Sequence, residues 1–365
     1  MFLCGDVMTG RGVDQILPYP SKPRLYEQFV ESALDYVAMA EKTNGPIPRC
    51  VDFSYVWGDA LDELDRVGPE ARIINLETSV TTSDVHDPKG INYRMNPANI
   101  PCLVAARIHC CALANNHVLD WGRPGLQETL ISLKKKAGIG AAGAGFNLTE
   151  AVQPCVIETH PGRVLVFAFA TADSGVPPEW AATAAECGVS FLPDLSDATA
   201  DRFAEHAGAV KRPGDIVVVS AHWGGNWGYG ISRSQRSFAH RLIDSGTVDL
   251  VHGHSSHHRK AIEVYRNKLI LYGCGDFLND YEGIEGFEEF RSQLTLMYFA
   301  TLDGSTQNLV SLEMTPLEIH RFRLRKAGKD DAQWLGEVLN GEGKPFGTGT
   351  TLQGSNRLKL EWARS

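Results

Sequence analysis

Side chains that can bind metals or transfer protons follow the predicted strands of this chain, at the point where each strand ends. They occur in six separate segments, from Asp6 to Asp276. In open α/β sheets, ligands bind outside the carboxyl ends of the strands. Six segments with this arrangement therefore predict one polar site along a single rim. The residues are Asp6, Asn75, Glu77, Asn115, Asn116, His117, His222, His252, His254, His257, His258 and Asp276.

A dense histidine cluster follows the strand predicted at 248–251. Four histidines fall within residues 252–258 of an acidic chain, and this density indicates metal binding or proton transfer. His258, next to Arg259, is the member that most resembles an exposed surface residue. Asp6 taken alone is as easily a turn residue. Its five companion segments favour a role as ligand.

Histidines and aspartates also occur in pairs that could transfer a proton. A neutral imidazole is a general base near pH 7, and an adjacent carboxylate fixes its tautomer and raises its basicity. Two such pairs on opposite faces of one carbon would remove a proton from one side and return it to the other, which is epimerisation. The candidate pairs are His117 with Asp120, His254 or His257 with Asp276, and, as a weaker third pair, His86 with Asp87.

Three further residues are candidates for binding the substrate. Arg11 could hold a carboxylate or phosphate through two hydrogen bonds, or it could equally form a salt bridge with a neighbour. Trp223 and Trp227 lie in a glycine-rich loop. They could belong to the core, but in such a loop they could also form the walls of a pocket for an apolar or peptide substrate.

The elements that must position these residues alternate between strands and helices in the first part of the chain and are mostly strands later. This order predicts an α/β fold in which two sheets pack face to face with helices outside, a four-layer α/β/β/α sandwich. We expect one catalytic domain over residues 1–320, with 321–365 as a C-terminal helix and tail packed on it. Strands are predicted at 2–7, 71–76, 108–113, 153–158, 164–170, 216–221, 248–251, 260–265, 268–273, 293–301 and 310–320, and helices at 25–41, 56–67, 125–137, 200–211 and 232–245.

Charge and composition exclude some classes of partner. The net charge of −9 disfavours nucleic acid, whose phosphates an acidic chain repels. No segment approaches the roughly 20 apolar residues that span a bilayer, and the first residues lack the pattern of a signal peptide. We therefore expect a cytoplasmic protein without a membrane segment, and a homodimer is compatible with this composition. The 8 cysteines include no CxxC pair, which favours buried thiols over a zinc site.

The motifs along residues 1–300 resemble, in order, those of the CapA-like branch of the calcineurin-type metallophosphoesterase superfamily. The resemblance implies the four-layer sandwich with a divalent metal at its loop ends. It also implies that His117 is an acid or base and that the ligands are Asp6, Glu77, Asn116, His222, His254 and His257. The motifs are GDVMTGR (5–11), NLE (75–77), LANNHVLDWG (113–122), SAHWGGNWG (220–228), GHSSH (253–257) and YGCGDF (272–277).

Two departures from the superfamily bear on the metal. The first motif usually continues as Asp-x-His, but Met8 stands two residues after Asp6, and NLE lacks the paired aspartate of the usual second motif. These departures predict one ion rather than two. Oxygen ligands suit Ca²⁺, Mg²⁺ or Mn²⁺, whereas the histidines would suit Mn²⁺, Fe²⁺ or Zn²⁺.

The resemblance and the histidine–aspartate pairs lead to one main functional hypothesis. Some CapA-like proteins resemble epimerases of lasso-peptide gene clusters, so we expect a metal-dependent enzyme that inverts the Cα centre of the C-terminal residue of a precursor peptide. The alternatives are a metal-dependent phosphoesterase and a factor in capsule or poly-γ-glutamate synthesis. A binding module without catalysis is disfavoured, because most of the histidines are retained.

Overall fold

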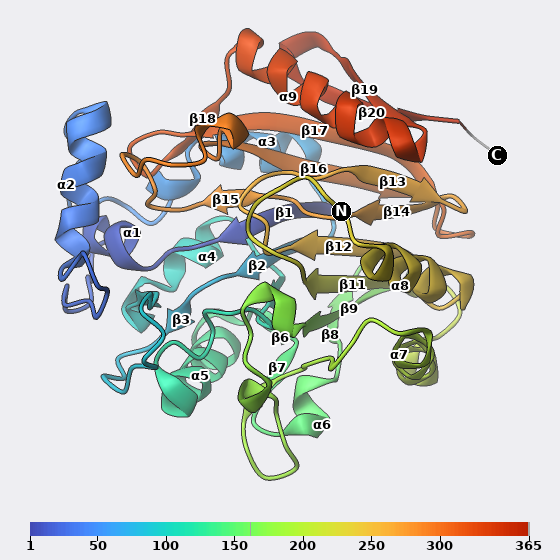
Figure 1. Ribbon diagram of the computed structural model, residues 1–365, viewed down its shortest axis with the longest axis horizontal. Helices are drawn as coiled ribbons and strands as arrows, with labels where there is room; N and C mark the ends of the chain where they lie inside the picture. The colour runs from blue at the N-terminus through green and yellow to red at the C-terminus, as the bar shows by residue number, and fades with distance from the viewer. Residues whose placement is uncertain (161, 364–365) are drawn as a thin grey trace.

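The larger of the two main sheets is built around the N-terminal strand. The structure is a computed structural model that describes residues 1–160 and 162–363 (Figure 1). Strand β1 (Phe2–Val7) is buried throughout and pairs in parallel with β2 (Arg72–Leu76) and antiparallel with β16 (Leu294–Leu302). The strand order is β19-β20-β17-β16-β1-β2-β5-β6, with β15 also paired to β1 and β18 to β17. The other strands are β5 (Cys110–Ala112), β6 (Gly140–Ala142), β15 (Asp276–Leu278), β17 (Leu309–Ile319), β18 (Leu324–Lys326), β19 (Thr348–Leu352) and β20 (Leu358–Trp362).

The second sheet has the strand order β13-β14-β12-β11-β9-β8. Its centre is parallel, because β11 pairs in parallel with both β9 and β12, and the hairpin of β13 and β14 closes one edge. A continuous apolar run such as that of β11 is typical of a strand covered on both faces. The strands are β8 (Cys155–Glu158), β9 (Arg163–Ala170), β11 (Ile216–His222), β12 (Leu250–His254), β13 (Ile262–Tyr265) and β14 (Lys268–Leu271).

The two faces of the second sheet contribute to different cores. Val217 and Val219 of β11 pack with α7 (Asp197–Val210) and α8 (Arg233–Asp244) in an outer core. Val218 belongs to the core between the sheets, where β1 contacts β12 and β5 contacts β9. Side chains alternate along a strand, so residues of even number in β11 face the other sheet. His222 therefore points between the sheets.

Helices cover the larger sheet as well, which completes the four layers. Buried side chains of α3 (Asp59–Val67), α4 (Pro101–Ala105) and α5 (Gly122–Ile131) pack in the main core around this sheet. In Figure 1, α7 and α8 lie beside the second sheet. The predicted four-layer α/β/β/α sandwich is confirmed.

Two segments differ from the sequence prediction. The helix predicted at 25–41 is α2 (Ala33–Asn44), because the Ser32 side chain accepts a hydrogen bond from the backbone of Leu34 and caps the helix there. After residue 320, the structure has α9 (Lys329–Gly343), but it also has β19 and β20. β20 pairs with β17, so this end of the chain extends the larger sheet, along its edge in Figure 1.

The remaining elements are short. None of the helices in the described residues is long and apolar enough to cross a membrane. The short elements are α1 (Arg11–Ile16), α6 (Leu148–Ala151), a π-helical turn (Ser132–Ala137), β3 (Ser79–Val80), β4 (Arg94–Met95), β7 (Ala144–Gly145) and β10 (Gly188–Val189).

Candidate metal centre

Asp6 and Asp276 are brought together by a close approach of two backbones. A Cβ atom on Gly5 would lie 1.6 Å from the carbonyl oxygen of Gly275, so glycine is required at position 5. The backbone N–H of Asp6 donates to that oxygen over 2.9 Å. Asp6 at the end of β1 thus stands opposite Asp276 at the start of β15, and both carboxylates are buried.

Two histidines from the second sheet face these carboxylates. β11 and β12 pair in parallel with His222 opposite His254, and their Nδ1 atoms lie 2.8 Å apart. Ser220 holds the other nitrogen of His254, with its Oγ 2.7 Å from Nε2. Asn116 Oδ1 lies 3.1 Å from His222 Nε2. Both rings are therefore fixed, with their Nδ1 atoms directed to one point.

His257 approaches the same centre from the loop after β12. Its Nδ1 lies 2.9 Å from Asp276 Oδ1. Between the two ligand histidines, Ser255 has a φ of 96°, and its hydroxyl donates to the carbonyl oxygen of Gly224 over 2.9 Å. Such a conformation is strained for serine, and strain of this kind often occurs at functional sites.

These residues form two groups that could hold a metal ion, and Asp6 belongs to both. One group is Asp6, His222 and His254, and the other is Asp6, His257 and Asp276. Within each group the ligand atoms lie within 4.8 Å of one another. The donor set therefore offers two neighbouring positions, whereas the sequence departures predicted a single ion.

Excess negative charge surrounds Asp6. Burial and then the charge of Asp276 raise the pKa of Asp6 to about 7. Burial and Asp6 raise the pKa of Glu77 well above its usual range. Asn75 donates to both carboxylates, to Asp6 Oδ1 over 2.7 Å and to Glu77 Oε2 over 3.1 Å. Asp6 Oδ2, although buried, has no hydrogen-bond partner among residues 1–160 and 162–363.

The donor set fits a divalent cation. Burial lowers the pKa of His222 and of His254 well below the usual range, so both rings are neutral and each can offer a lone pair. The unpartnered oxygen of Asp6 is a free acceptor at the same point. Mixed carboxylate and imidazole donors suit Mn²⁺ and related ions.

Beside this centre lies a histidine–aspartate pair. His117 Nδ1 is 2.7 Å from Asp120 Oδ2, and its Nε2 is 3.9 Å from Glu77 Oε1. The backbone N–H of Tyr93 donates to Asp120 Oδ2 over 2.6 Å, and Lys89 Nζ lies 2.7 Å from Oδ1. Burial lowers the pKa of His117 to about 4, against the influence of Asp120. His117 is therefore neutral at pH 7, with Nε2 free of the pair.

A cavity of about 450 Å³ opens onto His117, Asn116 and His257. One side of it is apolar, because the Trp227 ring stacks on the exposed Phe287 with centroids 4.2 Å apart. The other side carries Lys89, which also donates to the backbone oxygen of Asn116. A substrate that combines an anionic group with an apolar part would match both sides.

The predicted substrate residues have different environments. Trp227 lines the cavity beside His117 and His257, where the sequence prediction of a pocket wall would place it. Trp223 does not: it is buried in the outer core, and its indole N–H donates to the carbonyl oxygen of Tyr272 over 3.0 Å. Neighbouring residues of an extended chain point to opposite sides, so a ligand role for His222 directs Trp223 away from the cavity.

Arg11 has the salt-bridge role that the sequence left open. Its Nη2 lies 2.6 Å from Asp280 Oδ1, its Nη1 lies 3.0 Å from Glu27 Oε1, and its guanidinium lies over the Tyr36 ring. All three partners compete with a substrate anion. Arg11 borders the cavity, but these partners already bind its guanidinium group. Its contacts therefore favour a structural salt bridge over direct binding of the substrate.

The structure selects one alternative for one predicted proton-transfer pair and separates the members of another. Asp276 pairs with His257 and not with His254, whose ring faces His222 and Ser220. His86 stacks on Tyr26 with ring centroids 3.6 Å apart, and it lines a different cavity together with Asp87. No hydrogen bond joins their side chains within the described residues. His86 and Asp87 therefore do not line the cavity beside His117.

Several residues of the site were missed in the sequence. Lys89 and Tyr93 lie in an irregular loop, where no periodic pattern indicates which side chains meet. The Tyr93 ring stacks on His117 at 3.8 Å between centroids, and its hydroxyl lies 2.6 Å from that of Tyr281. His252, by contrast, is structural, since its Nε2 bonds to the carbonyl oxygen of Cys4 over 2.7 Å.

Substitution of the two tryptophans should separate substrate binding from folding. We expect Trp227→Ala to raise the KM for a substrate with an apolar group while the melting temperature changes little. Trp223→Ala empties a buried core position, and we expect it to lower the free energy of unfolding by about 3–5 kcal/mol. Chemical denaturation and steady-state kinetics on both variants measure this. Equal loss of stability in both would contradict the assignment of Trp227 to the cavity wall.

The two packed sheets bring carboxylates, an amide and histidines together at the carboxyl ends of their strands, and the comparisons with known proteins identify the chain as CapA-like. The family profile described as bacterial capsule synthesis protein PGA_cap matches residues 1–281. The chain belongs to that family.

Relatives with curated names extend the comparison over almost the whole chain. A probable polyglutamine synthesis accessory protein of Mycobacterium tuberculosis is 47% identical over 363 residues, which is 99% of this chain and 95% of that protein. The PGA biosynthesis protein CapA of Bacillus subtilis is 27% identical over 334 residues, 89% of this chain and 73% of that protein.

Two solved structures are also similar to this chain. One is a hypothetical protein from Thermus thermophilus, with 14% identity and a TM-score of 0.45 over 87% of this chain and 98% of that one. The other is a phosphatase from Mycoplasma pneumoniae, with 12% identity and a TM-score of 0.46 over 72% of this chain and 90% of that one.

Proposed function

We propose that the chain is a divalent-metal-dependent phosphoesterase that acts in the synthesis of a polyglutamine or poly-γ-glutamate polymer. The observation that carries the proposal is that neutral His117, paired with Asp120, lines the same cavity as His257, a member of one of the two ligand groups that share Asp6. Phosphoester hydrolysis needs both a cation and a group that takes a proton from the attacking water and passes it to the leaving oxygen.

The residues of the chain divide this work among them. Asp6, His222 and His254 would hold one cation, and His257 and Asp276 would complete a second position with Asp6. Glu77 and Asn116 lie beside them as further oxygen donors. A bound divalent ion polarises a phosphoryl oxygen and lowers the pKa of water. Asp120 accepts the Nδ1–H of His117, so the Nε2 lone pair of the neutral ring can take a proton from the attacking water and then give that proton to the leaving oxygen.

Lys89 supports an anionic substrate at this position. Its ammonium group is held by Asp120 and by the backbone oxygen of Asn116, at the wall of the catalytic cavity. The Arg11 side chain is 2% exposed between two carboxylates, whereas the Lys89 side chain is 22% exposed, so its ammonium group can attract a phosphate oxygen while it stays paired with Asp120. The acidic chain is otherwise unsuited to anions, so this local charge favours a phosphoester.

The names of the relatives support the proposed role of this chain in polymer synthesis. The M. tuberculosis protein is named as an accessory protein of polyglutamine synthesis and the B. subtilis protein as a PGA biosynthesis protein. The identity of 47% over nearly the full length of both chains favours a shared role.

Peptide epimerisation remains a second candidate, favoured by one observation. The structure contains two histidine–carboxylate pairs at the catalytic cavity, His117 with Asp120 and His257 with Asp276. Two bases are what inversion of a carbon centre requires. The names of the relatives point to polymer synthesis, so this hypothesis is the weaker one and stays a prediction.

One pair of assays distinguishes the two reactions. The protein, stripped with EDTA and then supplied with Mn²⁺, is given bis-p-nitrophenyl phosphate, and the release of nitrophenol is recorded. In parallel it is incubated in D₂O with peptides, and deuterium at the C-terminal Cα is measured by mass spectrometry. We expect Mn²⁺-dependent phosphoester turnover without deuterium uptake. Deuterium uptake without turnover would replace the proposal by the epimerase.

The role in polymer synthesis needs a cellular measurement. In a polymer-producing bacterium that lacks its own family member, we expect this chain to restore the polymer and the variant Asp6→Asn not to restore it. Restoration by both would show that the metal centre is not needed for that role.

A further inference from the structure

Three large apolar side chains that are exposed to solvent border the cavity beside His117. Ile91, Ile284 and Phe287 keep 45%, 47% and 49% of their surface exposed, and each of them lines this cavity of about 450 Å³. Single exposed apolar residues are normal on a protein surface, but several around one cavity mark a site for an apolar ligand or partner. We call Ile91, Ile284 and Phe287 the apolar rim.

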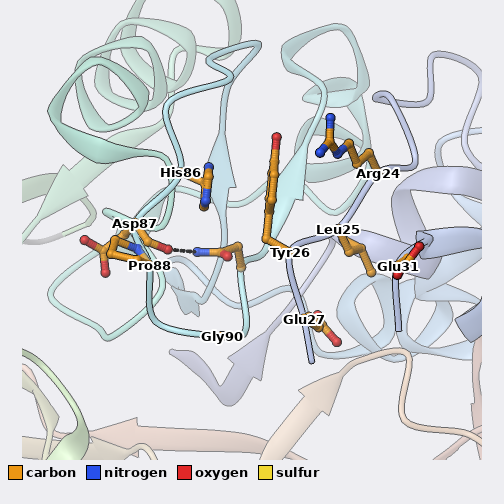
Figure 2. Close-up of a pocket in the computed structure, with 10 residues that line it drawn as sticks. Arg24, Leu25, Tyr26, Glu27, Glu31, His86, Asp87, Pro88 and Gly90 are labelled. Atoms are coloured by element: carbon orange, nitrogen blue, oxygen red, sulfur yellow. Dashed lines mark hydrogen bonds between the residues drawn. The ribbon is translucent and has the colours of Figure 1, made fainter. Parts of the chain in front are cut away.

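Ile91 belongs to the loop 86–92, which has two sides. Gly90 and Asn92 line a separate cavity, of about 800 Å³, whose walls Figure 2 shows. Lys89 and Ile91 line the cavity of the apolar rim instead. The loop therefore presents a cation and an apolar side chain, two residues apart, to the same cavity.

The rest of the apolar rim lies on a second loop, residues 283–287, which is anchored on both sides. Before this loop, the buried carboxylate of Glu282 accepts hydrogen bonds from the backbone N–H groups of residues 321 and 322, over 2.7 and 2.6 Å. After it, the Arg259 guanidinium donates to the backbone carbonyl oxygen of Leu294 over 3.2 Å. Because these contacts fix the ends of the loop without a ligand, binding costs little further ordering of the chain.

The chemistry of the apolar rim favours an aliphatic ligand. Neither isoleucine side chain can form a hydrogen bond with a sugar or a base, and the stacked rings of Trp227 and Phe287 add a broad apolar surface. An apolar chain would remove the exposed surface of these side chains from water, which is favourable. Asn226 and Ser292 are polar side chains of the same cavity, so nucleoside phosphates are the competing class of ligand.

Charge sets the direction of such a ligand in the cavity. Lys89 is paired with the buried carboxylate of Asp120, whereas Glu285 is an exposed carboxylate on the loop of the apolar rim. No ion pair or hydrogen bond neutralises Glu285 within the part of the chain that the structure describes. A phosphate near Glu285 would be repelled, and one beside Lys89 and the metal ligand His257 would be attracted. The phosphate therefore belongs inside the cavity, and the uncharged chain lies along the apolar rim.

We propose that the cavity binds the phosphate ester of a long aliphatic alcohol, with the phosphate beside Lys89 and the metal ligands and the chain along the apolar rim. A phosphate group alone would fill only a small part of the cavity of about 450 Å³. That this ester is the substrate rests on the proposed hydrolysis. In that reaction the water oxygen bonds to phosphorus, the bond from phosphorus to the alcohol oxygen breaks, and the alcohol takes up the proton that His117 removed from the water. Binding of the ester does not rest on it.

Calorimetric titration of the protein, supplied with Mn²⁺, with butyl phosphate and octyl phosphate tests the proposal. Each methylene group removed from water raises the affinity by up to about fourfold. We expect Kd for octyl phosphate to be at least about tenfold lower than Kd for butyl phosphate, and lower than Kd for adenosine monophosphate. The inference is overturned if octyl phosphate shows no saturable binding, if the two alkyl esters have equal Kd values, or if the nucleotide binds more tightly.

Variants of the apolar rim locate the alkyl chain. The double variant that combines Ile284→Ser and Phe287→Asn should bring Kd for octyl phosphate close to Kd for butyl phosphate, which itself should change little. Both positions are exposed, and asparagine tolerates the φ of 65° at position 287, so the variant should fold normally. Leu352→Ser removes an exposed apolar side chain of β19 and should leave both Kd values unchanged, which excludes general binding of amphiphiles. Retention of the chain effect in the double variant, or its loss in Leu352→Ser, would contradict the inference.

The same ligands separate this inference from the proposed function. Octyl phosphate that binds as expected but releases no inorganic phosphate would keep the class of ligand and remove the phosphoesterase. Turnover of bis-p-nitrophenyl phosphate without tighter binding of the octyl ester would keep the phosphoesterase and remove the inference.

Discussion

Replacement of Asp6 by asparagine should remove divalent-metal binding, and with it the proposed phosphoester hydrolysis, from a protein that remains folded. Asp6 is the one residue common to both ligand groups, so its loss affects both positions. Loss of a residue that only supports a metal ligand typically costs 10- to 100-fold in affinity. We expect the affinity for Mn²⁺, measured by titration calorimetry, to fall by more than about 100-fold.

The fold should tolerate this change. Burial and Asp276 already disfavour the ionised form of Asp6 in the metal-free protein, as its pKa of about 7 indicates. Asparagine has the same shape and keeps an oxygen that can accept from Asn75. Asp215→Asn is a matched control, because Asp215 is a buried carboxylate paired with Arg163 just before β11, at the opposite end of that strand from His222. Unchanged Mn²⁺ binding in Asp6→Asn would refute the metal centre.

Replacement of His117 by asparagine should abolish catalysis without loss of the metal. His117 belongs to neither ligand group, and general acid–base catalysis typically contributes about 10²–10⁴-fold to the rate. We expect kcat to fall by that factor while the stoichiometry and affinity of Mn²⁺ stay unchanged. Asp120→Asn should have a smaller effect of the same kind, since Asp120 acts through His117.

The choice of leaving group makes the test of His117 specific. A proton donor matters most when the departing oxygen is strongly basic. The ratio of wild-type to variant kcat should therefore be larger for a phenyl or methyl phosphodiester than for the nitrophenyl diester. An equal ratio for all leaving groups would show that His117 does not donate the proton, and a loss of Mn²⁺ binding would instead make it a ligand.

The sequence contains enough information for most of the fold, because hydrophobic patterns and turn residues are local. The apolar run of β11 predicts a buried strand, and the strands predicted at 260–265 and 268–273 correspond to β13 and β14, which pair as a hairpin. The strands at residues 348–362 were not predicted. Their pairing with β17 is a long-range contact between polar, half-exposed segments that carry only weak patterns.

Much of the candidate site was predictable for a geometric reason. Parallel strands of the two sheets end on the same side, so Asp6, His222 and His254 had to meet once the sheets packed together. The sequence could not show which of Trp223 and Trp227 lines the cavity, because this depends on the side of the strand to which His222 points. The positions of His86 and Lys89 depend on an irregular loop whose course is set by contacts with Asp120.

The pairing of β1 with β15 has a consequence for how the protein is made. Arg11, shortly after β1, is bonded to Asp280, 269 residues further along the chain, and Asp6 stands opposite Asp276. At 5–20 residues per second, the ribosome needs on the order of tens of seconds to synthesise the intervening chain. Asp6 is therefore synthesised long before Asp276 leaves the ribosome. A cation that needs both ligand groups could therefore bind only after residue 276 has left the ribosome.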